Sequence, residues 1–276
     1  MNLCLDIGAT NIRIAEVEGA KIKNYQKQKT PRTKRELVSV LIKIISQYKN
    51  YSNICIATAG FEQEGKIHGA INFPYFNNTP LKSILRKKFN VPVYIQNDAR
   101  CAALAELNLG SGKKFNNFVL LTLGTGIGGA IIINKKLYLG KGTAGEIGSM
   151  FIEHKKIFEH LASGNASLKI AEKLGFKKIT SLELEELAKK GNKKAISVYN
   201  QVGFYLDIGL ADLSYALSPD AFVIGGGFSR VKFIFPEAIK TLNSSYHISP
   251  KPKLVKAKFG DDAGLIGASL LTKSNL

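Results

Sequence analysis

The sequence predicts an α/β fold built from two similar domains, each a mixed β-sheet with helices. The chain has 276 residues, which is enough for two domains of ordinary size. A hairpin pattern with a glycine turn occurs at 3–17 and returns with the same layout at 119–133. Later in each half an apolar strand pattern ends at glycine, at 54–60 and at 221–227. Strands in a meander, followed by strands that alternate with helices, are typical of a mixed sheet.

Each half can be followed element by element. The first hairpin leads into a turn at Glu18-Gly19 and the second into a turn at Asn134-Lys135, and a third strand is expected after each turn. In the first half the segment 91–96 is expected to form a further short strand. Apolar residues at three- and four-residue spacing predict helices over 33–48, 99–109, 181–190, 194–217 and 263–273.

The domain boundaries follow from one polar stretch. Residues 108–118 are polar and contain glycine, so they are expected to connect the two domains. The last helical pattern is expected to return to the first domain. The predicted boundaries are 1–108 plus 263–276 for a small N-terminal domain and 109–262 for a large C-terminal domain.

Composition places the chain among ordinary globular proteins. Hydrophobic residues make up 45% and charged residues 22%. No apolar run approaches the roughly 18 residues that a membrane-spanning helix needs. The first residues lack the basic start and the cleavage site of a signal peptide, so a cytoplasmic protein with no membrane contact is expected.

The formal charge of +18 raises the question of a nucleic-acid partner. Lysine supplies most of the excess, in short pairs such as Lys87-Lys88, Lys113-Lys114 and Lys193-Lys194. Aromatic residues do not alternate with these lysines, as a platform for stacked bases requires. The pattern therefore predicts a lysine-rich, solvated surface and no nucleic-acid partner. The positive field still favours anionic small molecules such as nucleotides.

The three cysteines are predicted to be small core residues. Cys4, Cys55 and Cys101 lie far apart in the sequence and match no metal or redox spacing. Each has apolar neighbours, and free cysteine often packs as a small hydrophobic side chain. No disulfide is expected.

Three stretches place glycine at the end of a strand, where backbone N–H groups can bind phosphate oxygens. The stretch Gly124-Thr-Gly-Ile-Gly-Gly129 fits the spacing of a dinucleotide-binding loop. That loop needs a helix directly after the glycines, whereas a second strand is expected here. A P-loop is also absent, because no Gly-Lys-Ser/Thr sequence follows a suitable glycine. Two glycine hairpins and a third glycine loop at 225–227 remain as candidate phosphate sites.

These three motifs carry a resemblance to a known family. Asp6-Ile-Gly-Ala-Thr-Asn-Ile-Arg13 resembles the first phosphate motif of the actin-like sugar kinases, and Leu123-Gly-Thr-Gly-Ile-Gly-Gly129 resembles the second. Val223-Ile-Gly-Gly-Gly-Phe-Ser229 is similar to their adenosine motif. The details match the ROK family of repressors, open reading frames and sugar kinases. The resemblance implies the two-domain actin-like ATPase fold, related to ribonuclease H, with a cleft between duplicated domains.

The resemblance also implies where ATP and its metal ion bind. ATP and Mg²⁺ are expected mainly on the second domain. The implied ATP- and phosphate-binding residues are Asp6, Gly8, Thr10, Asn11, Arg13, Gly124, Thr125, Gly126, Gly225, Gly226 and Gly227. Asp6 is expected to hold Mg²⁺ through a water molecule, although Asp6 alone could also serve only to shape its turn.

The segment Asn97-Asp98 follows a short strand and precedes a helical pattern. Asn and Asp are common helix caps, so a purely structural role is one interpretation. Ligands of α/β sheets gather at the carboxyl ends of strands, which favours a functional role. The resemblance implies that Asp98 is the general base that accepts the proton of a sugar hydroxyl during phosphoryl transfer.

Sugar-binding residues are implied at several further positions. Gly60 follows a strand, as a Pro-Gly pair does in the family, and Asn72-Phe-Pro resembles the family's Asn-Leu-Pro. Glu146 and Glu159 match the two sugar-binding glutamates, and a buried glutamate without a ligand is costly, so both are expected to line a polar cleft or to be exposed. The implied sugar-binding set is Gly60, Asn72, Asn97, Asp98, Glu146 and Glu159.

The sequence departs from the family at its zinc loop. The family has one His and three Cys there, but Ser149 occupies the His position and no cysteine follows Cys101. The stretch from Ser149 to Glu159 is also shorter than the family pattern. No structural zinc is expected, because His154 and His160 cannot replace a thiolate site by themselves. Loss of the family His is expected to affect the choice of sugar at C2.

The expected activity is phosphorylation of a hexose at its 6-hydroxyl, with glucose as the first acceptor and broad specificity possible. The alternatives within the class are a kinase for N-acetylglucosamine, N-acetylmannosamine or fructose. A sugar-sensing regulator is a different class, disfavoured because the first strand pattern begins at Leu3 and leaves no room for a helix-turn-helix. A related ATPase or carboxylate kinase also stays open. The family resemblance makes a homodimer possible, although the sequence shows no interface.

Overall fold

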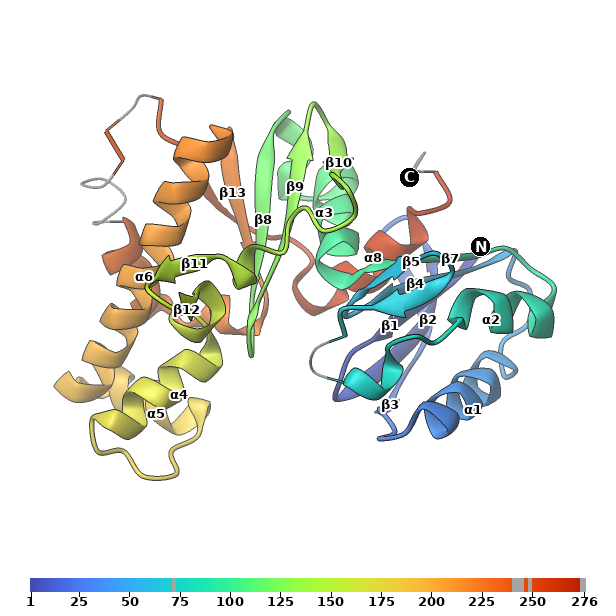
Figure 1. Ribbon diagram of the computed structural model, residues 1–276, viewed down its shortest axis with the longest axis horizontal. Coiled ribbons are helices and arrows are strands. Elements are labelled where there is room, and N and C mark those ends of the chain that lie inside the picture. The colour runs from blue at the N-terminus through green and yellow to red at the C-terminus, as the bar shows by residue number, and fades with distance from the viewer. Residues whose placement is uncertain (71–72, 240–245, 248–249, 274–276) are drawn as a thin grey trace. The chain divides into compact units, whose positions relative to one another are not determined.

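The computed structural model describes residues 1–70, 73–239, 246–247 and 250–273. The chain forms two compact units (Figure 1). Unit 1 contains Met1–Lys113 and Asp261–Leu276, and unit 2 contains Lys114–Gly260. The domain boundaries drawn from the sequence, 1–108 plus 263–276 and 109–262, remain a prediction.

Unit 1 is built on a five-stranded sheet in the order β3-β2-β1-β4-β7. Its strands are β1 (Asn2–Ile7), β2 (Asn11–Glu18), β3 (Lys21–Lys29), β4 (Asn53–Thr58) and β7 (Val93–Asn97). β1 pairs antiparallel with β2 and parallel with β4, and β4 pairs parallel with β7. β1 and β4 are buried on both faces, which explains their nearly continuous apolar sequences. The edge strand β3 is mostly exposed and rich in lysine, an arrangement that discourages pairing with another chain.

The helices of unit 1 are α1 (Lys34–Ile45), α2 (Leu81–Phe89), α3 (Asp98–Leu109) and α8 (Ala263–Ser269). Helix α1 begins after Thr33, whose side chain caps it by accepting from the Glu36 N–H. Helices α8 and α3 pack closely because Gly267 has no side chain. A methyl group at that position would overlap the Cys101 carbonyl group. Cys4, Cys55 and Cys101 are all free and buried, as predicted for core residues.

Unit 2 repeats the sheet of unit 1. Its strand order is β10-β9-β8-β13-β14, formed by β8 (Phe118–Leu123), β9 (Ile127–Ile133), β10 (Lys136–Tyr138), β13 (Ala221–Gly225) and β14 (Lys253–Lys256). β8 pairs antiparallel with β9 and parallel with β13, and β13 pairs parallel with β14. Order and direction match unit 1 strand for strand. This match confirms the duplication that the sequence layout predicts.

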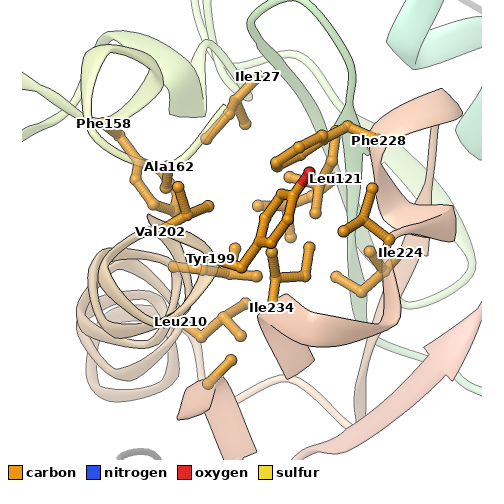
Figure 2. Close-up of a cluster of buried hydrophobic side chains, with 14 of the residues drawn as sticks. Leu121, Ile127, Phe158, Ala162, Tyr199, Val202, Leu210, Ile224, Phe228 and Ile234 are labelled. Atoms are coloured by element: carbon orange, nitrogen blue, oxygen red, sulfur yellow. The ribbon is translucent and has the colours of Figure 1, made fainter. Parts of the chain in front are cut away.

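The core of unit 2 lies between this sheet and the long helix α6 (Lys193–Leu217), with α4 (Gly164–Lys173) and α5 (Ser181–Lys189) beside it. Figure 2 shows Tyr199 and Val202 of α6 facing Leu121 and Ile224 of the sheet. Phe158, just before α4, closes the same cluster. The loop that carries Phe158 is thereby fixed to the core of the unit.

Two short hairpins complete the described structure: β5 (Phe61–Gln63) with β6 (Lys66–His68), and β11 (Phe151–Glu153) with β12 (Lys156–Ile157). The sequence did not predict these hairpins, nor helices α2 and α4. The strands of the two hairpins have only two or three residues, too few to show a period. Helix α2 does carry apolar residues at helical spacing, at Leu81, Ile84, Leu85 and Phe89, so its sequence contains a helix signal that the prediction did not include. No helix in the described ranges is long and apolar enough to span a membrane.

Candidate active site

Two carboxylates of unit 1 lie at the carboxyl end of its sheet. Asp6 is next to the last residue of β1, and Asp98 begins α3 directly after β7. The hairpin register places Asp6 opposite Arg13, and the Arg13 guanidinium lies 2.6 Å from Asp6 Oδ2. Its other nitrogen donates to the Asp261 carbonyl oxygen at 2.5 Å. Arg13 therefore joins β1, β2 and the segment that precedes α8.

Burial shapes the acidity of both carboxyl groups. Asp6 is only 6% exposed, and burial raises its pKa to about 6, although Arg13 lowers it and the Asp98 and Asp261 carboxylates raise it. Burial also raises the pKa of Asp98, against the lowering effects of its backbone hydrogen bonds and of Arg13. A carboxylate with a raised pKa is a better proton acceptor, which is what a general base requires.

The helix cap at the start of α3 is Asn97. Its Oδ1 accepts from the Arg100 N–H at 3.2 Å, and its Nδ2 donates to the Gly60 carbonyl oxygen at 3.1 Å. Asp98 accepts from the Ala99 N–H at 2.8 Å and stays partly exposed. The structural role and the functional role proposed for Asn97-Asp98 therefore fall on different residues. Asn97 caps the helix, and the partly exposed Asp98 is available for a functional role.

The first glycine hairpin of unit 1 turns through Gly8, Ala9 and Thr10. The Gly8 N–H donates to the Asn11 carbonyl oxygen at 3.0 Å. Thr30 fixes this turn through two hydrogen bonds. Its hydroxyl donates to the Gly8 carbonyl oxygen at 2.6 Å, and its N–H donates to the Thr10 carbonyl oxygen at 3.0 Å. The N–H groups of Ala9 and Thr10 have no partner within the described residues. Such free, adjacent N–H groups are suited to bind an anion.

In unit 2 the two strands are also joined by three residues, Gly124, Thr125 and Gly126. The register is one residue tighter, since Leu123 pairs with Ile127 whereas Ile7 pairs with Ile12. The Gly124 N–H donates to the Gly126 carbonyl oxygen at 3.0 Å. The start of α4 holds this turn, with the Gly164 N–H on the Gly124 carbonyl at 2.8 Å and the Asn165 N–H on the Thr125 carbonyl at 3.3 Å. Over the part of the chain that the structure covers, the N–H groups of Thr125 and Gly126 are unpaired. Both units therefore offer a loop of backbone donors.

The third glycine loop follows β13. Gly225 ends the strand, and Gly226 has a φ of 85°, in the region that favours glycine. A methyl group on Gly226 would also overlap the Leu123 backbone. The Ser229 hydroxyl donates to the Gly226 carbonyl at 2.7 Å, and Gly227 opens the short helical turn that follows. The backbone of this loop is thus packed against the end of β8.

The predicted sugar residues fall in both units. Glu146 is exposed and Glu159 is half-buried, so neither is enclosed in an apolar core. Glu159 Oε2 accepts from the Ile127 N–H at 3.4 Å, and a methyl group on Gly126 would overlap the same oxygen. Asn72 lies outside the described residues. In unit 1 the structure brings together Asp6, Arg13 and Asp98, and in unit 2 it brings Glu159 to the glycine hairpin.

Two of these contacts were not predictable from the sequence. Asp261 is 248 residues from Arg13, and Glu159 is 32 residues from Ile127. No local sequence pattern predicts contacts of this kind, because each one forms only when a distant loop folds back onto a hairpin. Arg13 was expected at a phosphate; the structure shows in addition that it neutralises Asp6.

A short hairpin occupies the segment in which the zinc loop was expected to be missing. β11 and β12 are joined at His154-Lys155, and Lys156 pairs with Glu153 at 3.0 Å. The Tyr205 hydroxyl of α6 donates to Glu153 at 3.0 Å and ties the hairpin down. His154 and His160 are both exposed. Among the residues that the structure describes, no group of three or more His, Cys, Asp or Glu side chains could hold a metal ion.

Comparisons with known proteins agree with this architecture. The sequence model of the ROK family matches residues 2–275. A glucokinase of Streptomyces coelicolor is 28% identical, over 99% of this chain and 98% of the relative. An N-acetylmannosamine kinase of Haemophilus influenzae is 30% identical, over 99% of this chain and 96% of the relative. A solved ROK family glucokinase from Streptomyces griseus, in complex with glucose and AMPPNP, superposes with a TM-score of 0.85 at 27% identity, covering 98% of each chain.

Proposed function

The chain belongs to the ROK family and is an ATP-dependent sugar kinase without the family's cysteine loop, and we propose that it phosphorylates a hexose at the 6-hydroxyl. The observation that carries this proposal is the position of Asp98. It begins a helix at the carboxyl end of β7, partly exposed, with a raised pKa. That is the place and the acidity expected of a general base for a sugar hydroxyl.

In this mechanism Asp98 accepts the proton of the 6-hydroxyl as the hydroxyl oxygen attacks the γ-phosphorus of ATP, and the bond from that phosphorus to the β,γ-bridging oxygen breaks, so that ADP leaves. Phosphoryl transfer has a loose transition state, so alignment and charge stabilisation provide most of the catalysis. One carboxylate is sufficient for the proton, provided that the hydroxyl is held in line. The hydrogen bond from the Ala99 N–H, at 2.8 Å, fixes the orientation of the Asp98 side chain.

The glycine loops are proposed to bind the phosphates. Free N–H groups at Thr10 in unit 1, and at Thr125 and Gly126 in unit 2, can donate to phosphate oxygens. The exposed hydroxyls of Thr10 and Thr125 are additional donors. Gly225, Gly226 and Gly227 would contact the adenosine, where the absence of side chains permits close approach. Phosphate and adenosine binding in this proposal therefore relies on the backbone more than on charged side chains.

The unit 1 carboxylates fit a magnesium ion that arrives with the nucleotide. Mg²⁺ prefers carboxylate oxygens and keeps several waters, and one or two protein carboxylates suffice beside the phosphates. Asp6 supplies such an oxygen, and its Arg13 partner offsets part of its charge. The ion would neutralise charge on the phosphate oxygens. Asp6 would hold it through a water molecule, and Arg13 would keep the Asp6 side chain in place.

Sugar recognition is proposed to use Asn97 and Asp98 with Gly60 and Asn72, together with Glu146 and Glu159. Glucose is the acceptor we expect first, since glucokinases are among the similar proteins. N-acetylmannosamine is a second candidate, favoured by an N-acetylmannosamine kinase of comparable similarity. The β11–β12 hairpin replaces a longer loop next to Ser149, which favours a broader choice at C2. We expect the reaction to use ATP of the cytoplasm. The homodimer that the family resemblance suggests stays a prediction.

The experiment that tests this proposal identifies the product. The purified chain is incubated with ATP, Mg²⁺ and ¹³C-labelled glucose or N-acetylmannosamine, and the product is examined by ³¹P and ¹³C NMR. A 6-phosphate is expected, and 6-deoxyglucose should be no acceptor. Phosphate on another oxygen, or turnover of 6-deoxyglucose, would overturn the assignment of the 6-hydroxyl.

A further inference from the structure

The side chain of Glu159 lies on the glycine hairpin that we propose as a phosphate site in unit 2. Its Oε2 accepts from the Ile127 N–H at 3.4 Å. The same oxygen lies so close to Gly126 that a methyl group there would overlap it. A carboxylate therefore occupies the side of the hairpin next to the free N–H groups of Thr125 and Gly126.

The position of the Glu159 backbone does not depend on this contact. The Phe158 N–H donates to the Met150 carbonyl at 2.8 Å, and the Leu161 N–H donates to the Phe158 carbonyl at 3.0 Å. Phe158 is itself buried in the core of the unit. The side-chain bond is long by comparison, at the upper end of the range for hydrogen bonds. The carboxylate can therefore leave the hairpin without unfolding the segment that carries it.

A carboxylate in this position opposes the binding of a phosphate. The free N–H groups of Thr125 and Gly126 attract an anion, but the negative charge of Glu159 beside them repels it. The attraction and the repulsion act at the same three-residue turn. Phosphate affinity at this loop therefore depends on where the Glu159 carboxylate points.

We infer that Glu159 couples acceptor binding to donor binding. Without sugar, its carboxylate lies on the Gly126–Ile127 peptide and weakens nucleotide binding at the loop. When sugar binds, one of its hydroxyls donates a hydrogen bond to the Glu159 carboxylate. The carboxylate then moves away from the hairpin, and nucleotide binding at the loop becomes stronger. By linkage, nucleotide must strengthen sugar binding by the same factor. The inference rests on the proposed function, since it needs Glu159 to bind the sugar.

The test compares Glu159→Gln with the wild type in the absence of sugar. Glutamine keeps an oxygen for the Ile127 N–H but removes the charge. Isothermal titration with Mg²⁺ and AMPPNP should give a Kd about tenfold lower for Glu159→Gln, from the loss of one nearby like charge. The matched control is Glu172→Gln on α4, an exposed residue that changes the net charge equally. Its Kd should equal that of the wild type.

Glu159→Ala provides a second variant, and thermal melts confirm that both variants are folded. In the wild type, saturating glucose should lower the Kd for AMPPNP severalfold, and both variants should lose this effect. Equal or weaker sugar-free affinity in the folded Glu159 variants would overturn the inference. Absence of any sugar turnover in the wild type would instead count against the proposed function, so the two failures can be told apart.

Discussion

At the scale of single residues, the chemistry of unit 1 depends on two carboxylates in one charged cluster. Asp6 is paired with Arg13 at 2.6 Å, whereas Asp98 begins a helix and keeps exposed surface. Both pKa values are raised, chiefly by burial. The difference in partners agrees with the roles proposed for the two groups, because Arg13 fixes the Asp6 carboxylate whereas Asp98 has no ion-pair partner among the described residues and is partly exposed.

Asp98→Asn should remove the base while keeping the structure. Asparagine can still accept from the Ala99 N–H, so the start of α3 is retained. Loss of a general base lowers kcat by about a thousandfold. The affinity for AMPPNP, measured by titration, should stay within about twofold of wild type. A variant with a near-normal kcat would exclude Asp98 as the base.

Asp6 should leave a signature in the pH dependence of stability. Its folded pKa of about 6 lies above the ordinary aspartate value of 3.8, so the native state binds more protons than the unfolded chain between these values. The Asp6 contribution to the free energy of unfolding therefore falls as pH rises from about 4 to about 6, by about 2 kcal/mol in all.

Asp6→Asn removes the Asp6 contribution to the pH dependence of the free energy of unfolding. The substitution also removes the ion pair with Arg13, which changes the free energy of unfolding by an amount that does not vary with pH across this range. Urea denaturation of both proteins between pH 4 and pH 7 measures the difference. The stability of Asp6→Asn relative to wild type should rise across that range. Parallel curves for the two proteins would show that the carboxyl group of Asp6 titrates normally.

Residue identities could be predicted where a motif carries them, and contacts could not. The pairing of Asp6 with Arg13 follows from a hairpin register that two adjacent strands impose. The contact from Arg13 to Asp261 needs the chain to return after unit 2, and the Glu159 contact needs the fold of unit 2. Sequence patterns describe neighbours along the chain, so contacts made by distant loops escape them.

At the scale of elements, the return of helix α8 completes unit 1. Its seven residues are all buried, and it packs on α3 and the sheet. Gly264 faces the Asp6 carboxylate, and Gly267 faces the Cys101 carbonyl group. Two glycines therefore set how closely this helix approaches the carboxylate cluster.

Gly267→Ala should destabilise the protein. Alanine favours a helix by up to about 1 kcal/mol, but its methyl group would overlap backbone atoms of Cys101 that cannot turn away. The overlap should prevail, with a net loss of about 2 kcal/mol in the free energy of unfolding. Gly227→Ala is the control, since a methyl group there meets nothing within 4 Å. Equal stability of the two variants, measured by urea denaturation, would contradict close packing of α8.

The β11–β12 hairpin shows what the sequence could and could not indicate at this scale. The loss of cysteines after Cys101 was visible directly. The β11–β12 hairpin itself could not be predicted, because its strands are only three and two residues long. The hairpin contains the Glu153–Lys156 pair and is contacted by Tyr205 of α6, and no local sequence pattern predicts the Tyr205 contact.

At the scale of the whole molecule, duplication was the most predictable feature. Two glycine hairpins with the same layout indicated two units of similar architecture, and both sheets have the same order and strand directions. The helices predicted over 33–48 and 194–217 occur at Lys34–Ile45 and Lys193–Leu217. Long periodic patterns identify helices well. Length alone does not explain why α2 and α4 were missed, because they have nine and ten residues and the predicted helix α5 also has nine.

The measurement that tests the central claim most directly is ADP release by the purified chain with ATP and Mg²⁺ across a panel of sugars. The panel contains glucose, mannose, fructose, glucosamine, N-acetylglucosamine and N-acetylmannosamine. The account predicts strong stimulation by one or more of these sugars, with glucose or N-acetylmannosamine first, and almost none with Asp98→Asn. Nucleotide binding without stimulation by any sugar would contradict the assignment as a hexose kinase.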